Sequence, residues 1–320
     1  MEKETSIPYT GYKISRDKVI YTTVYNELRY TLPVENADPA TFEILSSMYG
    51  KDKYYVFWMS QVIERADPET FEVLQGDYAK DKDQVYAGTE IISKSPKDFE
   101  FLSHEFVRCA EGILFKRIPI KYTGIIVDVG SFEPLNNYYS QDKNKIYCTY
   151  YGYDCYNTEV VDTDRDNFRV ISGPFAKDIK HIFLYGEMVP QFDPDSFQVI
   201  NEHFVKDHQY VYFLKSSHIK HTEEAFPVIV EGTDPVTFEI MTCVRSARWS
   251  HPVCGYARDK MYVYRYVVDW LTAPDGFFHI EALPTADPIT FDYEQPIDSH
   301  EIFNRVMNES DPDTAQNDLN

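Results

Sequence analysis

The chain has 320 residues, 43% of them hydrophobic, so it is long enough to bury a sizeable core and too apolar to be disordered. Its formal net charge is −21, from 31 Lys and Arg against 52 Asp and Glu. A field of that sign repels phosphate backbones and anionic lipid, which argues against nucleic acid and membrane surfaces as ligands. Aromatic residues make up 16% of the chain, and rings at this density favour half-buried β-sheets.

The ends and the cysteines indicate where the protein resides. Residues 1–11 form an N-terminal extension without the apolar segment of a secretory signal, and no run of about 18 apolar residues follows. The five cysteines form no Cys-x-x-Cys pair, and their odd number favours free thiols in a reducing compartment. We therefore expect a cytoplasmic protein.

From residue 12 onward, one motif recurs: Asp-Pro-x-Thr/Ser-Phe, followed by alternating apolar residues. Its clear copies are anchored by Asp38 and Phe42, Asp67 and Phe71, Asp193 and Phe197, Asp234 and Phe238, and Asp287 and Phe291, and weaker copies end at Phe99, Phe132 and Phe168. The Asp suits a capping position and the Pro suits the first position of a turn. We expect each Phe to point inward as the plug of that turn.

A second motif alternates with the first. It is a basic residue, Asp and usually Lys, as in Lys51-Asp52-Lys53, followed by an apolar or aromatic pair. This pattern predicts a polar turn that leads into a new strand. The interval from Phe42 to Phe71 is 29 residues, and longer intervals further along the chain mark insertions.

A unit of this length holds about three short strands, too few to bury a core alone, so the units must stack. The sequence therefore predicts an all-β array of about eight antiparallel β-meander repeats over residues 12–304. An open, curved, solenoid-like array fits the unequal insertions better than the alternative, a closed β-propeller. Residues 305–320 are acidic and nearly free of apolar side chains, which predicts a disordered tail.

The Lys-Asp-Lys-x-x-Val-Tyr core and the Ala-Asp-Pro-x-Thr-Phe-Glu-Val-Leu segment together resemble the DKNYY family, a group of bacterial repeat proteins. The resemblance spans about residues 12 to 293 and is strongest at residues 51–102 and 177–200. It implies a repeat fold and a bacterial origin, and it implies no enzymatic activity. The fourth copy departs from the family pattern, with Arg108-Cys109-Ala110-Glu111 in place of Asp-Lys.

Several patterns suggest chemistry and are better explained otherwise. The Asp-Lys pairs recur, whereas a catalytic site is a single constellation, so we interpret them as turns. The run from Asp162 to Asp166 starts like a calcium loop but has Asn167 and Gly173 where Gly and Glu are needed. His218 and His221 form a weak zinc pattern in an inserted segment. We expect no catalytic residue, metal or cofactor, and no nucleotide motif is present.

Two inserted segments between Phe238 and Phe291, residues 241–256 and 264–279, are locally basic and aromatic within an acidic chain. Trp, Tyr and Arg dominate the energetics of protein interfaces, so these segments are candidate partner-binding sites. The residues concerned are Arg245, Arg248, Trp249, His251, Tyr264, Trp270 and Phe277. The alternative is that they are extra strands that cap the end of the array.

These features predict a non-enzymatic protein-binding module with a basic protein partner, most concretely an immunity or antitoxin-like inhibitor of a bacterial toxin. One alternative is a structural scaffold that binds a glycan or peptide by aromatic stacking. Another is an enzyme with its site around His218, His221 or His251, which stoichiometric zinc in the purified protein would support.

Overall fold

The computed structural model describes residues 10–25, 28–120, 126–151, 156–201, 203–214, 227–244, 253–269 and 277–291. The regular secondary structure of these residues is almost entirely β-strand, joined by turns, with two short 3-10 helices, η1 (Pro96–Asp98) and η3 (Arg165–Asn167). Within the described ranges, no helix has the length and apolar character needed to span a membrane.

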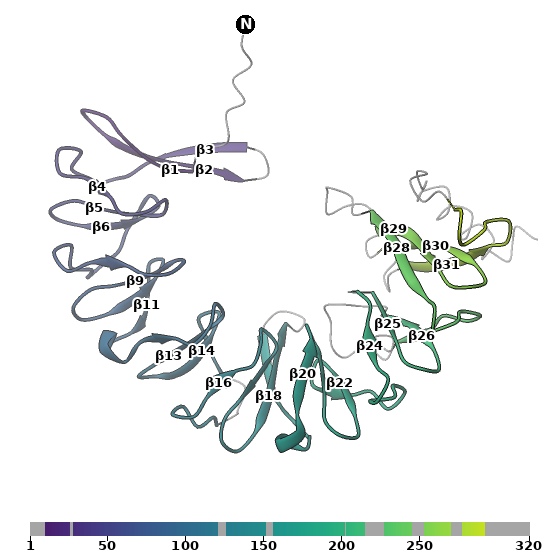
Figure 1. Ribbon diagram of the computed structural model, residues 1–320. Coiled ribbons are helices and arrows are strands. Elements are labelled where there is room, and N and C mark those ends of the chain that lie inside the picture. Colours follow the sequence, from purple (N-terminus) through teal and green to yellow (C-terminus); the bar gives the residue numbers. More distant parts are fainter. Residues whose placement is uncertain are drawn as a thin grey trace, which may run out of the picture. The chain divides into compact units, whose positions relative to one another are not determined.

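The first four sheets follow one another in chain order (Figure 1). The first contains β1 (Gly11–Ile14), β2 (Val19–Tyr25) and β3 (Leu28–Pro33). The second contains β4 (Glu43–Ile44), β5 (Tyr49–Lys51), β6 (Val56–Trp58) and β7 (Gln61–Val62). The third contains β8 (Glu72–Val73), β9 (Tyr78–Lys80), β10 (Val85–Ala87) and β11 (Glu90–Ser93). The fourth contains β12 (Glu100–Phe101), β13 (Phe106–Cys109), β14 (Gly112–Phe115) and β15 (Ile118–Pro119).

The remaining four sheets each contain four strands. The fifth contains β16 (Glu133–Pro134), β17 (Tyr139–Gln141), β18 (Ile146–Tyr151) and β19 (Tyr156–Val161). The sixth contains β20 (Arg169–Ser172), β21 (Phe175–Lys177), β22 (Ile182–Leu184) and β23 (Glu187–Met188). The seventh contains β24 (Gln198–Val199), β25 (Phe204–Lys206), β26 (Val211–Phe213) and β27 (Val228–Ile229). The eighth contains β28 (Glu239–Val244), β29 (Val253–Arg258), β30 (Val263–Asp269) and β31 (Phe277–Leu283).

The predicted array of about eight antiparallel meanders is confirmed, because in each sheet the strands lie side by side in chain order. The expectation of about three strands per unit is wrong for seven of the eight described sheets, which have four. The extra strand was missed because strands such as β4 and β7 have two residues, and two residues carry no readable alternation.

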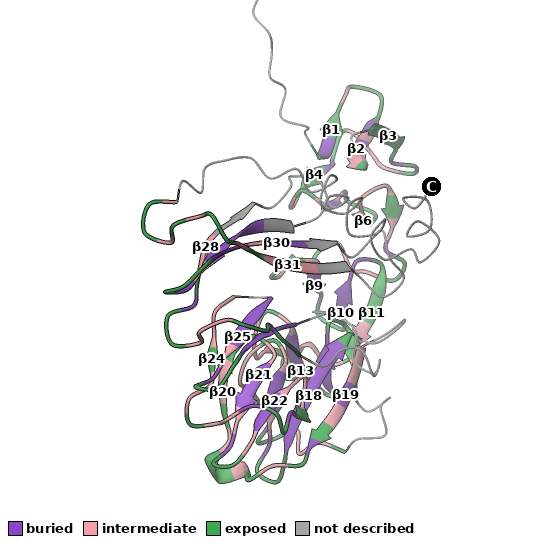
Figure 2. Cartoon of the chain, turned by 90° about the vertical axis from the view of Figure 1, so that its right-hand side faces the viewer, coloured by how far each residue is buried: buried purple, intermediate pink, exposed green. Residues whose placement is uncertain are grey.

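The chain divides into two compact units, Met1–Pro134 with Gln141–Asn144 and Leu135–Ser140 with Lys145–Asn320. Within each unit, the hydrophobic clusters join consecutive sheets, such as the first and second in unit 1 and the seventh and eighth in unit 2. Figure 2 shows buried residues concentrated in the middle strands and exposed residues on turns and outer strands.

The Phe that ends each Asp-Pro motif stacks on an aromatic ring of the preceding sheet. Phe71, for example, lies against Tyr49, with ring centroids 5.6 Å apart. The other pairs are Tyr12 with Phe42, Tyr78 with Phe99, Phe106 with Phe132, Tyr139 with Phe168, Phe175 with Phe197, Phe204 with Phe238, and Tyr256 with Phe291. The repeated Phe residues therefore occupy equivalent positions, each packed against the sheet that precedes it.

The exposure of these rings is not uniform. Phe42, Phe71 and Phe238 are buried, whereas Phe197 and Phe291 are partly exposed. At Phe197 a second ring shares the site, because Phe192 lies 4.8 Å from it and is itself buried. Where Phe192 stands, the clear copies of the motif in unit 1 have the smaller Ala37 and Ala66.

Candidate interaction surface

In six of the eight described sheets, the Asp of the Asp-Lys motif closes a turn with its side chain. In the third sheet, Oδ1 of Asp81 accepts hydrogen bonds from the N–H groups of Asp83 and Gln84, both at 2.8 Å. Oδ2 accepts the hydroxyl of Tyr86 at 2.7 Å. Asp81 is buried, as are the equivalent carboxylates Asp52, Asp142, Asp178, Asp207 and Asp259.

The same carboxylate also holds the preceding Asp-Pro turn. Oδ2 of Asp81 accepts the backbone N–H of Asp67, 14 residues earlier, at 3.0 Å. The separation of 14 residues recurs in the pairs Asp38 with Asp52, Asp128 with Asp142, Asp164 with Asp178, and Asp193 with Asp207. In the eighth sheet the equivalent bond joins Asp234 and Asp259, which are 25 residues apart. The two sequence motifs are therefore two halves of one hydrogen-bonded corner.

Burial and hydrogen bonding act in opposite directions on these carboxyl groups. Burial alone raises the pKa of Asp178, but hydrogen bonds from the N–H groups of Lys180, His181 and Asp164 outweigh it and lower the pKa to about 2. In Asp81 the same balance, with the Tyr86 hydroxyl among the donors, leaves the pKa below its usual value. Asp81 and Asp178 are therefore ionised at neutral pH and serve as acceptors for their turns.

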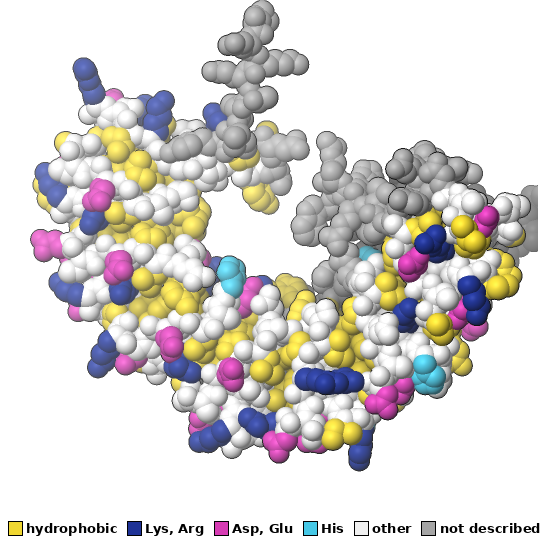
Figure 3. Space-filling view, viewed as in Figure 1, with side chains coloured by type: hydrophobic (Ala, Val, Ile, Leu, Met, Phe, Trp, Pro, Cys, Tyr) yellow, Lys and Arg dark blue, Asp and Glu magenta, His cyan; other side chains and the backbone are white. Residues whose placement is uncertain are grey.

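The two basic residues beside each Asp have separate roles. Lys82, after the Asp, pairs with the carboxylate of Asp67 at 2.8 Å, and its N–H donates to the hydroxyl of Thr70. Lys51, before the Asp, donates to the carbonyl of Pro68 in the Asp-Pro turn of the next repeat. Figure 3 shows such basic and acidic side chains side by side on the surface. The conspicuous polar residues of the motif are thus engaged in holding the fold.

One copy brings together Ser, His and Asp. His208 replaces the usual Lys, and its Nδ1 lies 2.9 Å from both the Ser196 hydroxyl and Oδ2 of Asp193. A catalytic triad uses one imidazole nitrogen for the acid and the other for the hydroxyl. Here one nitrogen faces both groups, and Ser196 also donates to Asp193. The cluster therefore corresponds to Thr70, Lys82 and Asp67 of the third sheet.

Two copies lack the turn-closing Asp. In the first sheet, the backbone N–H of Ser15 donates to the carbonyl of Lys18, as that of Asp81 does to Gln84, so Ser15 and not Asp17 occupies the Asp position. In the fourth sheet, Cys109 takes that position in a tight hairpin. Burial is the main cause that raises the pKa of the Cys109 thiol, which disfavours the reactive thiolate.

The tips of the Asp-Lys turns vary while the frame beneath them stays constant. The second sheet presents Tyr54 and Tyr55, which are 62% and 45% exposed. In unit 2, Tyr210, Met261 and Tyr262 are also exposed. The equivalent residues of the third sheet are the polar Asp83 and Gln84. Variable side chains on a rigid frame are typical of binding surfaces.

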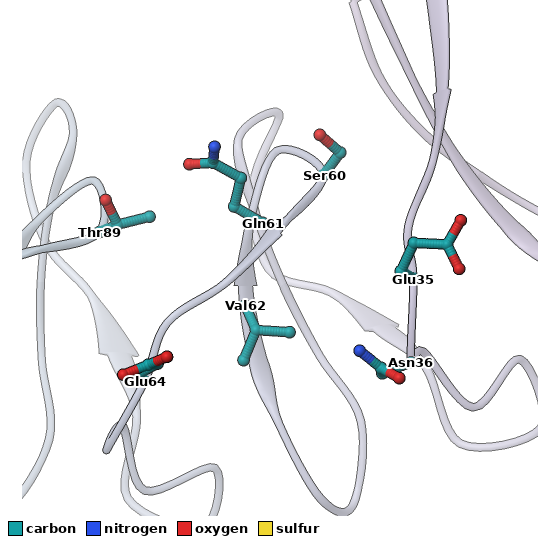
Figure 4. A pocket seen from close by; sticks show the side chains of 7 residues that line it. All are labelled: Glu35, Asn36, Ser60, Gln61, Val62, Glu64 and Thr89. Atoms are coloured by element: carbon teal, nitrogen blue, oxygen red, sulfur yellow. The ribbon is translucent and has the colours of Figure 1, made fainter.

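A polar hollow of about 550 Å³ lies in unit 1 (Figure 4). It is lined by Glu35, Asn36, Ser60, Gln61, Val62, Glu64 and Thr89. Glu35 and Glu64 hold equivalent places, since each precedes a residue with positive φ and an Ala-Asp-Pro sequence. Reasoning from the sequence missed this hollow, because it depends on the placement of consecutive sheets.

The predicted partner-binding residues are only partly described. Arg245, Arg248, Trp249, His251 and Trp270 lie outside the described residues, and Phe277 begins β31 but its side chain is not described. Tyr264 is in the core: it is 4% exposed, and its hydroxyl donates to Asp259. Its assignment to a partner-binding surface is therefore wrong. Tyr264 holds the position in the eighth sheet that Tyr86 holds in the third, where the hydroxyl donates to the turn-closing Asp.

The candidate metal ligands give a similar picture. His218 and His221 lie outside the described residues. Asp164 begins the short helix η3 and accepts a hydrogen bond from Asn167, so it caps a turn as the repeat predicts. In the described ranges, no group of three or more His, Cys, Asp and Glu side chains is arranged to hold a metal ion.

Comparison with known proteins places the chain in a family. The model of the DKNYY family matches three overlapping stretches, residues 12–148, 54–217 and 149–305. Neither the curated proteins nor the solved structures yielded a match. The matched stretches contain all eight sheets and the corners formed by their Asp-Pro and Asp-Lys motifs. The chain belongs to the DKNYY family.

Proposed function

We propose that this protein is a non-enzymatic binding module for a positively charged protein, and most concretely an immunity or antitoxin-like inhibitor of a bacterial toxin in the cytoplasm. The observation that carries the proposal is the formal net charge of −21 on a frame whose repeated polar residues hold its own turns. A field of this sign accelerates encounter with a basic partner and disfavours acidic ones.

The exposed turn tips support this proposal. Tyr54, Tyr55 and Tyr262 present aromatic surface from turns that are fixed by buried carboxylates. Rigid aromatic side chains contribute strongly to binding because little conformational entropy is lost when they are covered. Long-range charge would bring the partner in, and the aromatic tips would hold it.

The test uses the proteins encoded by the genes adjacent to this one. Each is purified, and its association with the full chain is measured at several salt concentrations. We expect one basic protein to bind, with an association rate constant that falls by at least about tenfold between roughly 20 and 300 mM salt. Co-expression is expected to relieve its toxicity. If no neighbour-encoded protein binds, the proposal fails.

A scaffold that binds a glycan is a second candidate, favoured by the pair Tyr54 and Tyr55, whose ring centroids are 6.4 Å apart on one turn. Adjacent exposed rings can stack on sugars. A glycan array separates the two proposals, because the scaffold predicts carbohydrate binding that depends on Tyr54 and is insensitive to salt.

A further inference from the structure

The last strand of the first sheet is a long exposed edge. β3 has six residues and is exposed at every one of them. Among the corresponding last strands, β7, β15, β23 and β27 have two residues each and β11 has four, whereas β19 has six and β31 has seven. Unlike β3, β19 has buried and partly buried residues. In the described part of the chain, β3 pairs with β2 on one side only. Natural proteins usually shorten or cover such an edge, because it offers backbone groups to another strand.

This edge carries an apolar strip made of Leu28, Tyr30 and Leu32, which are 60%, 44% and 44% exposed. Leu32 lies directly opposite the buried Tyr21, so the strip is on the face that packs against the second sheet. The strip is exposed because β2 and β3 are longer than β6 and β7, and Figure 1 shows their hairpin running past the second sheet.

The polar hollow begins two residues beyond the end of β3. Figure 4 shows Glu35 and Glu64 on either side of Gln61 and Val62. Neither Glu forms an ion pair with any described residue, whereas nearby Asp38, Glu43, Asp67 and Glu72 each pair with a Lys. The hollow therefore holds two exposed carboxylates that form no ion pair within the described residues, at the end of an apolar strip.

We propose that β3 is the docking edge for an extended strand of a basic protein partner. The strand would pair with the backbone of β3, cover Leu28, Tyr30 and Leu32, and place a Lys or Arg side chain in the hollow between Glu35 and Glu64. Strand addition to an exposed edge is a common mode of recognition, with backbone pairing for affinity and pockets for specificity. Charge complementarity identifies the occupant, and a second copy of this chain, with its net charge of −21, lacks it.

The inference rests on the proposed function only in that the partner is a basic protein. Its probe is a library of 12-residue peptides on phage, selected in parallel on the full chain and on the variant Leu28→Ser/Tyr30→Ser. Both side chains are exposed, so the variant is expected to fold, and circular dichroism checks this. Sequences enriched only on the natural chain are then synthesised and titrated.

We expect these peptides to contain Lys or Arg beside alternating apolar residues. Their affinity is expected to fall about tenfold for Glu35→Gln/Glu64→Gln and to disappear when alternate backbone amides of the peptide are methylated. The matched control is Ile91→Ser/Ile118→Ser, which removes two exposed apolar side chains elsewhere in unit 1 and is expected to leave the affinity unchanged.

Three results would overturn the inference. The first is that no peptide prefers the natural chain, and the second is that the peptides bind the Glu35→Gln/Glu64→Gln variant equally well. The third is that the natural chain dimerises through β3, which sedimentation would show as a dimer that the Leu28→Ser/Tyr30→Ser variant does not form. A neighbour-encoded protein that binds both variants as tightly as the natural chain would refute this docking edge and leave the proposed function standing. If peptides bind as expected but no neighbour-encoded protein binds the chain, the docking edge stands and the proposed function is refuted.

Discussion

At the scale of single residues, the buried carboxylate of each Asp-Lys motif fixes two segments that are distant in sequence. Asp81 accepts the N–H groups of its own turn, the N–H of Asp67 and the hydroxyl of Tyr86. A buried charge is tolerated when it is fully hydrogen-bonded. The sequence of the motif, an acidic residue between two basic ones, does not indicate a buried carboxylate, because charged runs of this kind usually lie on the solvated surface.

The substitution Asp81→Asn tests this role. An amide has one acceptor oxygen, so its NH₂ group would face either the turn N–H groups or the N–H of Asp67. We expect a loss of about 1–3 kcal/mol in the free energy of unfolding, measured with urea. Asp83→Asn, on the exposed tip of the same turn, is the matched control and is expected to change stability by less than about 0.5 kcal/mol. Equal effects of the two substitutions would refute the anchoring role.

The depressed pKa of Asp178 predicts an acid limb of stability. Its pKa is about 2 in the folded chain and about 3.9 when unfolded. A carboxyl whose pKa falls on folding adds stability above the unfolded value and loses it as the pH drops through the folded value. The natural chain is therefore expected to be more stable than Asp178→Asn at pH 5, and the difference is expected to shrink between about pH 4 and pH 2. A difference independent of pH would contradict the assignment.

At the scale of elements, consecutive sheets are joined by an aromatic residue of the middle strand. The hydroxyl of Tyr49 in β5 donates to the carbonyl of Asp77 and accepts the N–H of Gly88, both in the third sheet. Tyr139 in β17 makes the same pair of contacts with Pro174 and Gly186. Each such ring packs on the Phe of the next motif and also ties down the following hairpin.

The substitution Tyr49→Phe isolates the hydrogen bonds from the packing. It leaves the ring in place and removes both hydrogen bonds of the hydroxyl, while the N–H of Gly88 still donates to the carbonyl of Asp77. We therefore expect a loss of about 0.5–1.5 kcal/mol in the free energy of unfolding. Tyr55→Phe removes a hydroxyl from an exposed ring in the same sheet and is expected to be neutral. Thermal melts of both variants provide the measurement, and a neutral Tyr49→Phe would show that the ring contributes through packing alone.

At the scale of the whole molecule, the net charge of −21 opposes the compact state through self-repulsion. The ion pairs of the turns are exposed, and pairs of this kind contribute little. Screening is therefore expected to relieve more repulsion than attraction. The melting temperature is expected to rise between roughly 20 and 300 mM NaCl. A fall would mean that the ion pairs of the repeated corners outweigh the net charge.

The sequence by itself determined the repeat, its all-β character and the equivalence of the repeated Phe residues, because these follow from local rules of turn chemistry and alternation that act within about a dozen residues. Only the tertiary structure revealed what depends on neighbouring sheets. It showed that Asp67 and Asp81 form one corner, and that Tyr264 lies in the core. It also placed Glu35 and Glu64 at one hollow beside the exposed edge of β3. Contacts between consecutive sheets depend on the register and length of strands that are too short to leave a pattern in the sequence.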